Sequence, residues 1–173
     1  MSTMDFHLYL IFILDQNYFG INIKNLVKLY RTEKSNAPGT YLIRNNGEEK
    51  LLPVINIKHV LFLNNQKEFY LKKPEFETTI PTLIELESPL PDLCIHRMGI
   101  IVDFVIGLQQ VPPDDFIDPV SESKIPEKNQ MIINPTYIMA HCSAPVTNQR
   151  NQVIETPIHI IHVDNLFIHS VIS

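Results

Sequence analysis

The apolar residues of this chain come in short runs separated by polar turns, and this spacing limits the folds open to it. No segment keeps a helical spacing of apolar side chains over three turns, whereas strand-like runs recur at short intervals. The 13 prolines favour short elements, because proline interrupts helices and central strands. This pattern is typical of an all-β sandwich or barrel. A chain of 173 residues can form one domain with a substantial core, or two small lobes packed together.

The N-terminal third illustrates the pattern. Residues 8–14, LYLIFIL, form the longest continuous apolar run and predict a strand that is buried on both faces. Residues 21–30, INIKNLVKLY, fit helical spacing in part and strand alternation in part. A strand, one short helical turn and a new strand from Leu26 satisfy both signals. Asn46-Gly47 predicts a β-hairpin, because both residue types tolerate the positive φ of a tight turn. We interpret its polar tip, residues 45–50, as a solvated turn.

The rest of the chain repeats these signals. Further strand-like segments are expected in residues 81–87, 93–111, 133–142 and 156–167, with a helical turn in residues 59–65 and a second polar hairpin tip at residues 147–152.

The charge balance and the length of the apolar runs exclude two classes of partner. The formal net charge is −5, and no basic run is longer than Lys72-Lys73, so we expect no nucleic-acid binding. The longest apolar run falls far short of the roughly 20 residues that a membrane-spanning helix needs, so we expect no membrane insertion. The N-terminus lacks a basic leader, which favours a cytoplasmic protein.

Histidine is abundant enough for catalysis or metal binding to be weighed. His159 and His162 are three residues apart, and residues at odd separation face opposite sides of a strand, so we expect no metal site there. His141 and Cys142 could act as base and nucleophile, but adjacent strand residues also face apart. A small β-barrel hydrolase using His141 or Cys142 therefore stays as an alternative.

Other candidate groups have simpler interpretations. Asp114-Asp115 follows two prolines and is expected to end a strand in solvent. Five glycines form no phosphate-binding motif, so we expect no cofactor and no small-molecule substrate. Cys94 and Cys142 lack metal-binding spacing; two reduced, semi-buried cysteines are expected, and a disulfide between them stays open.

Several segments follow one another with the order and spacing of a known pattern over nearly the whole chain. They are LYLIFIL (8–14), YFGINIKNLVKLYR (18–31), GTYLIR (39–44), LPVINI (52–57), GIIVDFV (99–105), IDP (117–119) and IHIIHVDNLF (158–167). Together they resemble the CheW family of adaptors, which couple chemoreceptors to a histidine kinase. The chain departs from the family pattern in several places. Asn45 replaces a glycine, Leu42 replaces an asparagine and Asn56 replaces an aspartate. The hairpin before Pro53 is longer, and the glycine usual before the last hairpin is missing from residues 137–142.

The resemblance implies a fold, an activity and partners. The fold is two small five-stranded β-barrel lobes with a continuous core, which residues 1–173 would form as one domain. Members have no catalytic activity. One lobe docks on the regulatory domain of the kinase, and the groove between the lobes accepts the tip of a chemoreceptor. A coupler for a pilus or gliding system with a different partner stays as an alternative.

The resemblance also implies partner-binding residues, each of which has a structural alternative. Leu26, Lys28 and Pro53 match exposed positions on the kinase side, although Leu26 would equally suit the core. Val102 and Val105 match the groove between the lobes and would equally suit strand core. Asp103 lies between them in the sequence and is also a candidate partner-binding residue. It could cap a turn or contact a partner.

Arg44, at the base of the hairpin, could bridge the lobes or present a forked donor to a carboxylate of the partner. Its alternative is a salt bridge within the chain to Glu48 or Glu49.

Overall fold

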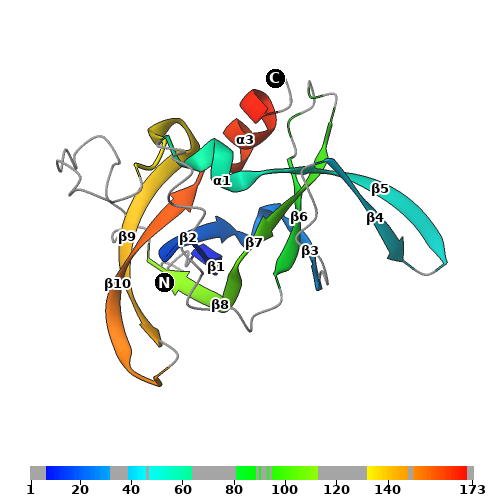
Figure 1. The fold of residues 1–173 in the computed structure, drawn as a ribbon. Helices are drawn as coiled ribbons and strands as arrows, with labels where there is room; N and C mark the ends of the chain where they lie inside the picture. Colours follow the sequence, from blue (N-terminus) through cyan, green and yellow to red (C-terminus); the bar gives the residue numbers. More distant parts are fainter. Residues whose placement is uncertain are drawn as a thin grey trace, which may run out of the picture.

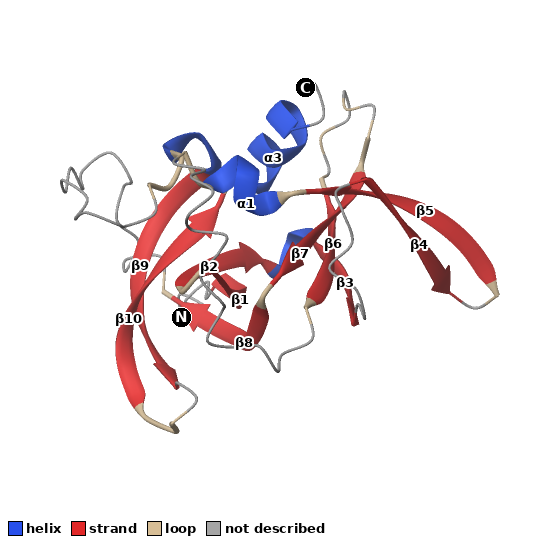
Figure 2. Ribbon diagram, in the orientation of Figure 1, coloured by secondary structure: helices blue, strands red, loops and turns tan. Residues whose placement is uncertain are grey.

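Strands make up most of the residues that the structure describes, and the helices among them are short (Figure 2). The computed structural model describes residues 7–31, 39–45, 47–63, 81–88, 90, 93, 95–112, 132–147 and 150–170, and of strand β4 it describes the Leu42 side chain alone. Asp114-Asp115, Cys94 and the IDP segment lie outside these residues. In the described part of the chain, no helix has the length and apolar character needed to cross a membrane.

The elements follow one another as short strands with a few helical turns. They are β1 (His7–Leu14), β2 (Asn17–Asn22), the 3-10 turn η1 (Ile23–Asn25), β3 (Leu26–Arg31), β4 (Gly39–Asn45), β5 (Glu48–Ile55), α1 (Ile57–Leu61), β6 (Thr82–Glu87), β7 (Arg97–Val102), β8 (Phe104–Val111), the 3-10 turn η4 (Pro135–Tyr137), β9 (Ile138–Thr147), β10 (Val153–Ile161) and α3 (Val163–Ser170).

The strands form two curled sheets that lie side by side (Figure 1). The first sheet has the order β8-β1-β2-β10-β9, and the second has the order β3-β6-β7-β5-β4. The chain passes from the first sheet to the second through η1 and returns between β7 and β8. The expected all-β fold with two five-stranded lobes is therefore confirmed. That residues 1–173 form a single domain stays a prediction.

Strand β1 joins the two lobes because its two faces serve different cores. Leu10, Phe12 and Leu14 belong to a core shared with the second sheet, whereas Tyr9 and Ile11 belong to a core inside the first lobe. This confirms the prediction of a strand buried on both faces. The shared core also includes α1, α3 and the inner residues of the second sheet, which are Ile84, Leu86, Met98, Ile100 and Val102. A third, small cluster of Leu52, Val54 and Leu83 lies inside the second lobe.

The hairpins follow from local turn chemistry. The β4–β5 hairpin forms as predicted, with Asn45 paired to Glu48 and a φ of +82° at Gly47, while Asn46 lies outside the described residues. Its tip is shorter than the predicted residues 45–50, because Asn45 pairs with Glu48 and the ladder continues into the polar segment. In Figure 1 this hairpin projects away from the rest of the second sheet. The strand, short helical turn and new strand predicted for residues 21–30 are confirmed.

Several segments differ from their prediction. The helical turn expected in residues 59–65 is helix α1, which begins at Ile57, and residues 135–137 of the expected strand segment 133–142 form η4. Residues 93–111 contain two strands in different sheets, because the chain turns at Asp103 between β7 and β8. Residues 163–167, expected as part of a C-terminal strand segment, belong to α3. Val163, Leu166 and Phe167 have the i, i+3, i+4 spacing of a helix face and pack into the shared core.

Helix α1 begins at Ile57, where Asn56 caps it by accepting a hydrogen bond from the His59 backbone N–H at 3.4 Å. Asparagine and aspartate cap helices comparably, so Asn56 can replace the family aspartate without loss of the cap.

Candidate interaction surfaces

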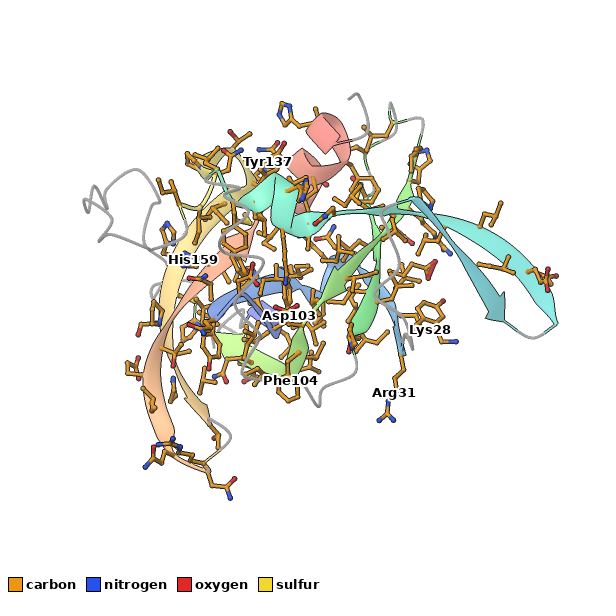
Figure 3. All side chains as sticks on the ribbon, viewed as in Figure 1. Lys28, Arg31, Asp103, Phe104, Tyr137 and His159 are labelled. Carbon is orange, nitrogen blue, oxygen red and sulfur yellow. The ribbon has the colours of Figure 1, made fainter. Side chains whose placement is uncertain are left out.

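Asp103 lies where the chain crosses between the two sheets, near the centre of the molecule in Figure 3. Its Oδ2 accepts a hydrogen bond from the Asp15 backbone N–H at 3.0 Å, and its own backbone N–H donates to the Ile13 carbonyl oxygen at 3.2 Å. Asp103 thus caps the β1–β2 turn of the first sheet directly after the last strand of the second sheet. Its carboxylate has a structural role at this junction.

Lys58 completes a junction cluster of Asp15, Lys58 and Asp103. Its Nζ lies 2.9 Å from Asp103 Oδ1 and 3.0 Å from Asp15 Oδ1. Burial alone lowers the pKa of Lys58, but attraction to Asp103 and Asp15 outweighs burial and leaves the pKa above its ordinary value. The cluster therefore ties α1, the β1–β2 turn and the β7–β8 crossing together through a lysine that stays charged.

The two valines beside Asp103 differ in exposure. Val102 is fully buried in the shared core, whereas Val105 is half-buried and packs against the same core. A partner can reach Val102 only if the core opens, so Val102 is not part of a binding surface in this conformation.

Strand β3 forms one edge of the second sheet and carries several exposed apolar side chains. Val27 and Leu29 are 37% and 39% exposed, and Ile23, in the turn before the strand, is 38% exposed. We call these three residues the β3 face. Leu26 is half-buried against the shared core.

Lys28 and Tyr30 lie on the side of β3 opposite Leu29, as alternation along a strand requires, and a β-bulge between Leu26 and Lys28 interrupts the alternation at Val27. Lys28 is exposed, and its Nζ lies 5.3 Å from the centre of the Tyr30 ring. The Tyr30 hydroxyl donates to Glu85 Oε2 at 3.3 Å, and Arg97 lies 3.9 Å from Glu85 Oε1. Burial and the nearby Glu85 raise the pKa of Tyr30. Glu85 itself is buried, and Tyr30 packs against the small cluster of Leu52, Val54 and Leu83 inside the second lobe.

Pro53 and Arg44 lie on the other side of the second sheet, on β5 and β4. Strands β6 and β7 separate β3 from β5, and neighbouring strands are spaced by about 4.8 Å. Leu26 and Lys28 pair with Leu86 and Glu85, so they face opposite sides of the sheet. Pro53 pairs with Thr40, four residues along the hairpin from Arg44. The structure therefore does not join these positions into one patch. Arg44 pairs with Glu49 across the hairpin backbone, and its side chain lies outside the described part.

The β9–β10 strand pair places the histidines and Cys142. Cys142 is only 3% exposed and packs inside the first lobe, while His141 lies on the opposite face of β9. His141 meets His159 of β10, with their Nδ1 atoms 2.7 Å apart. Burial and the neighbouring His141 lower the pKa of His159 to about 4. His162 follows β10, and its Nδ1 accepts a hydrogen bond from the Asn165 backbone N–H.

These positions do not fit the hydrolase alternative, because the Cys142 thiol and the His141 imidazole face different sides of the strand. Within the described residues, no group of three or more His, Cys, Asp or Glu side chains could hold a metal ion.

An open groove of about 330 Å³ lies beside η1, where the chain crosses to the second sheet. Tyr9, Ile160, Ile161 and Val163 supply apolar walls, and polar side chains such as Lys24 and Asp164 also line the groove. Exposed Met139 lines it as well. Neither Val102 nor Val105 lines this groove.

Sequence reasoning missed the β3 face, Met139, and the pairing of Lys58 with two carboxylates. The alternation of Val27 and Leu29 was visible, but exposure of both depends on β3 being an edge strand. Nothing in the sequence indicates that residues 15, 58 and 103 meet.

Comparisons with known proteins bear on the fold. No protein-family model matches the chain, and no curated protein sequence matches it. Among solved structures, it is similar to the crystal structure of scaffolding protein TtCheW from Thermoanaerobacter tengcongensis. The two share 16% sequence identity, with a TM-score of 0.54, over 91% of this chain and 84% of that one. The chain therefore has a divergent CheW-like fold.

Proposed function

We propose that the protein is a cytoplasmic, non-enzymatic adaptor that couples chemoreceptors to a CheA-type histidine kinase through protein–protein contacts. The CheW-like fold, matched over 91% of the chain, carries this proposal. The side chains of His141 and Cys142 face opposite sides of β9, which also supports an adaptor over a hydrolase.

The β3 face is the surface that we assign to the regulatory domain of the kinase. Edge strands present unpaired backbone groups, and native proteins usually protect them with charges, bulges or covering segments. Here the edge strand and the turn before it carry three exposed apolar side chains in a short span, and the exposed Lys28 lies on the same strand. Clustered exposed apolar residues with a polar surround suit a protein-binding site. Lys28 adds a positive charge that would favour an acidic partner surface.

The groove beside η1 is the surface that we assign to the chemoreceptor tip. Its apolar walls can accept apolar side chains of a helical hairpin, and Lys24 and Asp164 can pair with polar groups beside them. The kinase and the receptor would then contact different surfaces, so one adaptor could hold both.

Calorimetric titration against the regulatory domain of the histidine kinase from the same organism tests the assignment. Leu29→Ser should weaken binding by about tenfold or more, because it removes an exposed apolar contact. Leu108→Ser is the matched control, since Leu108 is an exposed leucine on β8, an edge strand of the first sheet. Lys28→Glu and Arg44→Ala test the two charged positions. Met139→Glu should weaken receptor binding and leave kinase binding unchanged.

Circular dichroism of each variant establishes that it is folded. Failure of the folded wild-type protein to bind the kinase domain would overturn the proposed function. Equal losses with Leu29→Ser and Leu108→Ser would overturn the β3 assignment and keep the adaptor role.

A further inference from the structure

His141 on β9 and His159 on β10 face each other across an antiparallel strand pair, where the register places them directly opposite. Their Nδ1 atoms are 2.7 Å apart, their ring centres are 4.8 Å apart, and their planes lie at 85° to each other. In the neutral pair, one ring donates this hydrogen bond and the other accepts it. The two Nδ1 atoms thus point toward each other from residues of paired β-strands, and no loop residue is needed to position them.

The surroundings hold the rings without closing the site. The His159 ring lies 5.5 Å from Phe19, which is fully buried and itself packs against Phe12 and Phe62. His141 and His159 are both half-buried, so water and small ions can reach them. Within the described part of the chain, neither imidazole has an ion pair with a carboxylate. His159 is labelled in Figure 3, on the side of the molecule that carries β9 and β10.

The distance between the nitrogens is close to that required for a shared metal ion. Zinc–imidazole bonds are about 2.0–2.1 Å long, so two such bonds at a tetrahedral angle place the nitrogens about 3.3 Å apart. The pair needs to separate by roughly 0.6 Å, which small side-chain rotations can supply. Imidazole nitrogen is a preferred ligand of Zn²⁺, Cu²⁺ and Ni²⁺, and Cu²⁺ binds such donors most tightly.

We propose that His141 and His159 form a two-imidazole binding site for a divalent transition-metal ion, Zn²⁺ or Cu²⁺. Both Nδ1 atoms coordinate the ion, and water fills the remaining positions. The ring that donates the hydrogen bond in the metal-free pair moves its proton from Nδ1 to Nε2. Each neutral ring therefore keeps one N–H, and binding releases no proton.

The ion would bridge the two outermost strands at one end of the first sheet. A closed structural zinc site has four protein ligands, whereas this site has two. The bound ion therefore exchanges readily with ions in solution and is not a permanent part of the fold. Binding to the folded state alone stabilises that state, so the unfolding temperature should rise with metal concentration. Neither His141 nor His159 lines the groove assigned to the receptor or belongs to the β3 face.

Titration of the full chain with Zn²⁺ alone and with Cu²⁺ alone tests the proposal. Calorimetry should give one ion per chain, with affinity reduced about tenfold or more in both His141→Gln and His159→Gln. His96→Gln is the control for adventitious binding, because His96 is an exposed histidine outside the pair. Electron paramagnetic resonance of the Cu²⁺ form should show two coupled nitrogens. An affinity unchanged in His141→Gln and His159→Gln, or reduced equally in His96→Gln, would overturn the site.

A measurement on the wild type covers the case in which a variant fails to fold. In a ¹⁵N-labelled sample, one equivalent of Zn²⁺ should shift the Nδ1 resonances of two histidines and abolish their mutual hydrogen bond. Shifts at other histidines alone would contradict the proposal.

Discussion

At the scale of single residues, the junction cluster shows how a few charges connect distant parts of the chain. Asp15, Lys58 and Asp103 come from three segments that are far apart in sequence, and each side chain is about a quarter to a third exposed. Partial burial strengthens the ion pairs relative to fully exposed ones, and the remaining exposure avoids the large desolvation cost of a dry site.

Replacing Lys58 with methionine should destabilise the protein by about 1–2 kcal/mol, because two half-buried carboxylates lose their shared cation. Chemical denaturation at neutral pH measures this loss. Lys50→Met is the matched control, since Lys50 is an exposed lysine on β5. A loss as large in the control would show that lysine removal in general, and not the cluster, lowers stability.

The raised pKa of Lys58 also sets the sign of the pH dependence of this contribution. A folded-state pKa above the ordinary 10.5 means that the contribution is fully present below about pH 10.5 and is lost as the pH rises through the folded-state value. The unfolding free energy of the wild type should therefore fall more steeply above pH 10.5 than that of Lys58→Met. Burial also raises the pKa values of Tyr9 and Tyr30. Both tyrosines are present in the wild type and in Lys58→Met, so their contributions to the pH dependence cancel when the two proteins are compared.

At the scale of elements, the β1–β2 hairpin carries local strain. Asp15 and Gln16 form its two-residue turn and have φ values of 45° and 68°. Both values lie in the left-handed region, which costs an L-residue roughly 1–2 kcal/mol. Asp15 gains its contacts with Asp103 and Lys58 in this conformation. Gln16 is exposed, and no such contact of its side chain offsets the strain among the described residues.

Gln16→Gly should therefore stabilise the protein by about 1 kcal/mol, because glycine adopts positive φ without a steric penalty. Gln109→Gly, in the extended backbone of β8, should destabilise it by about 0.5–1 kcal/mol. Thermal unfolding of both variants measures the two signs. Destabilisation by Gln16→Gly would contradict the assignment of strain to this turn.

At the scale of the whole molecule, the shared core makes the two lobes dependent on each other. Residues from both sheets, α1 and α3 pack in one cluster, while among the described residues the second lobe has only the small cluster around Leu52 for itself. Hydrogen bonds also connect the two lobes. Asn25 Nδ2 donates to the Glu87 carbonyl oxygen, and Ser88 Oγ donates to Asp164 Oδ1. Neither sheet could bury its inner face alone.

We expect the lobes to unfold together in one transition. Leu52→Ala in the second lobe and Ile158→Ala in the first should each lower the unfolding free energy by about 2–5 kcal/mol. Hydrogen exchange with mass spectrometry, measured in increasing denaturant, should show equal losses of protection in β6–β7 and in β9–β10 for either variant. Loss confined to the mutated lobe would show that the lobes unfold separately and contradict the single-domain prediction.

Local features of the fold were predictable from the sequence, and the assembly of the interaction surfaces was not. The strand at residues 8–14, the helical turn before Leu26 and the Asn46-Gly47 hairpin depend on side-chain alternation and on residues that tolerate positive φ. In contrast, the pairing of His141 with His159 depends on the register of two strands. Leu26 and Lys28 lie apart from Arg44 and Pro53 because β6 and β7 come between them in the sheet.

The sequence by itself determined where this chain is extended, where it turns and which faces of its strands are apolar, because these properties depend on neighbouring residues. Only the tertiary structure decided that residues 93–111 cross between sheets at Asp103, that α3 closes the shared core, and that β3 is an edge with exposed apolar residues. Strand order and burial depend on contacts between residues far apart in the chain, and no local pattern specifies those contacts.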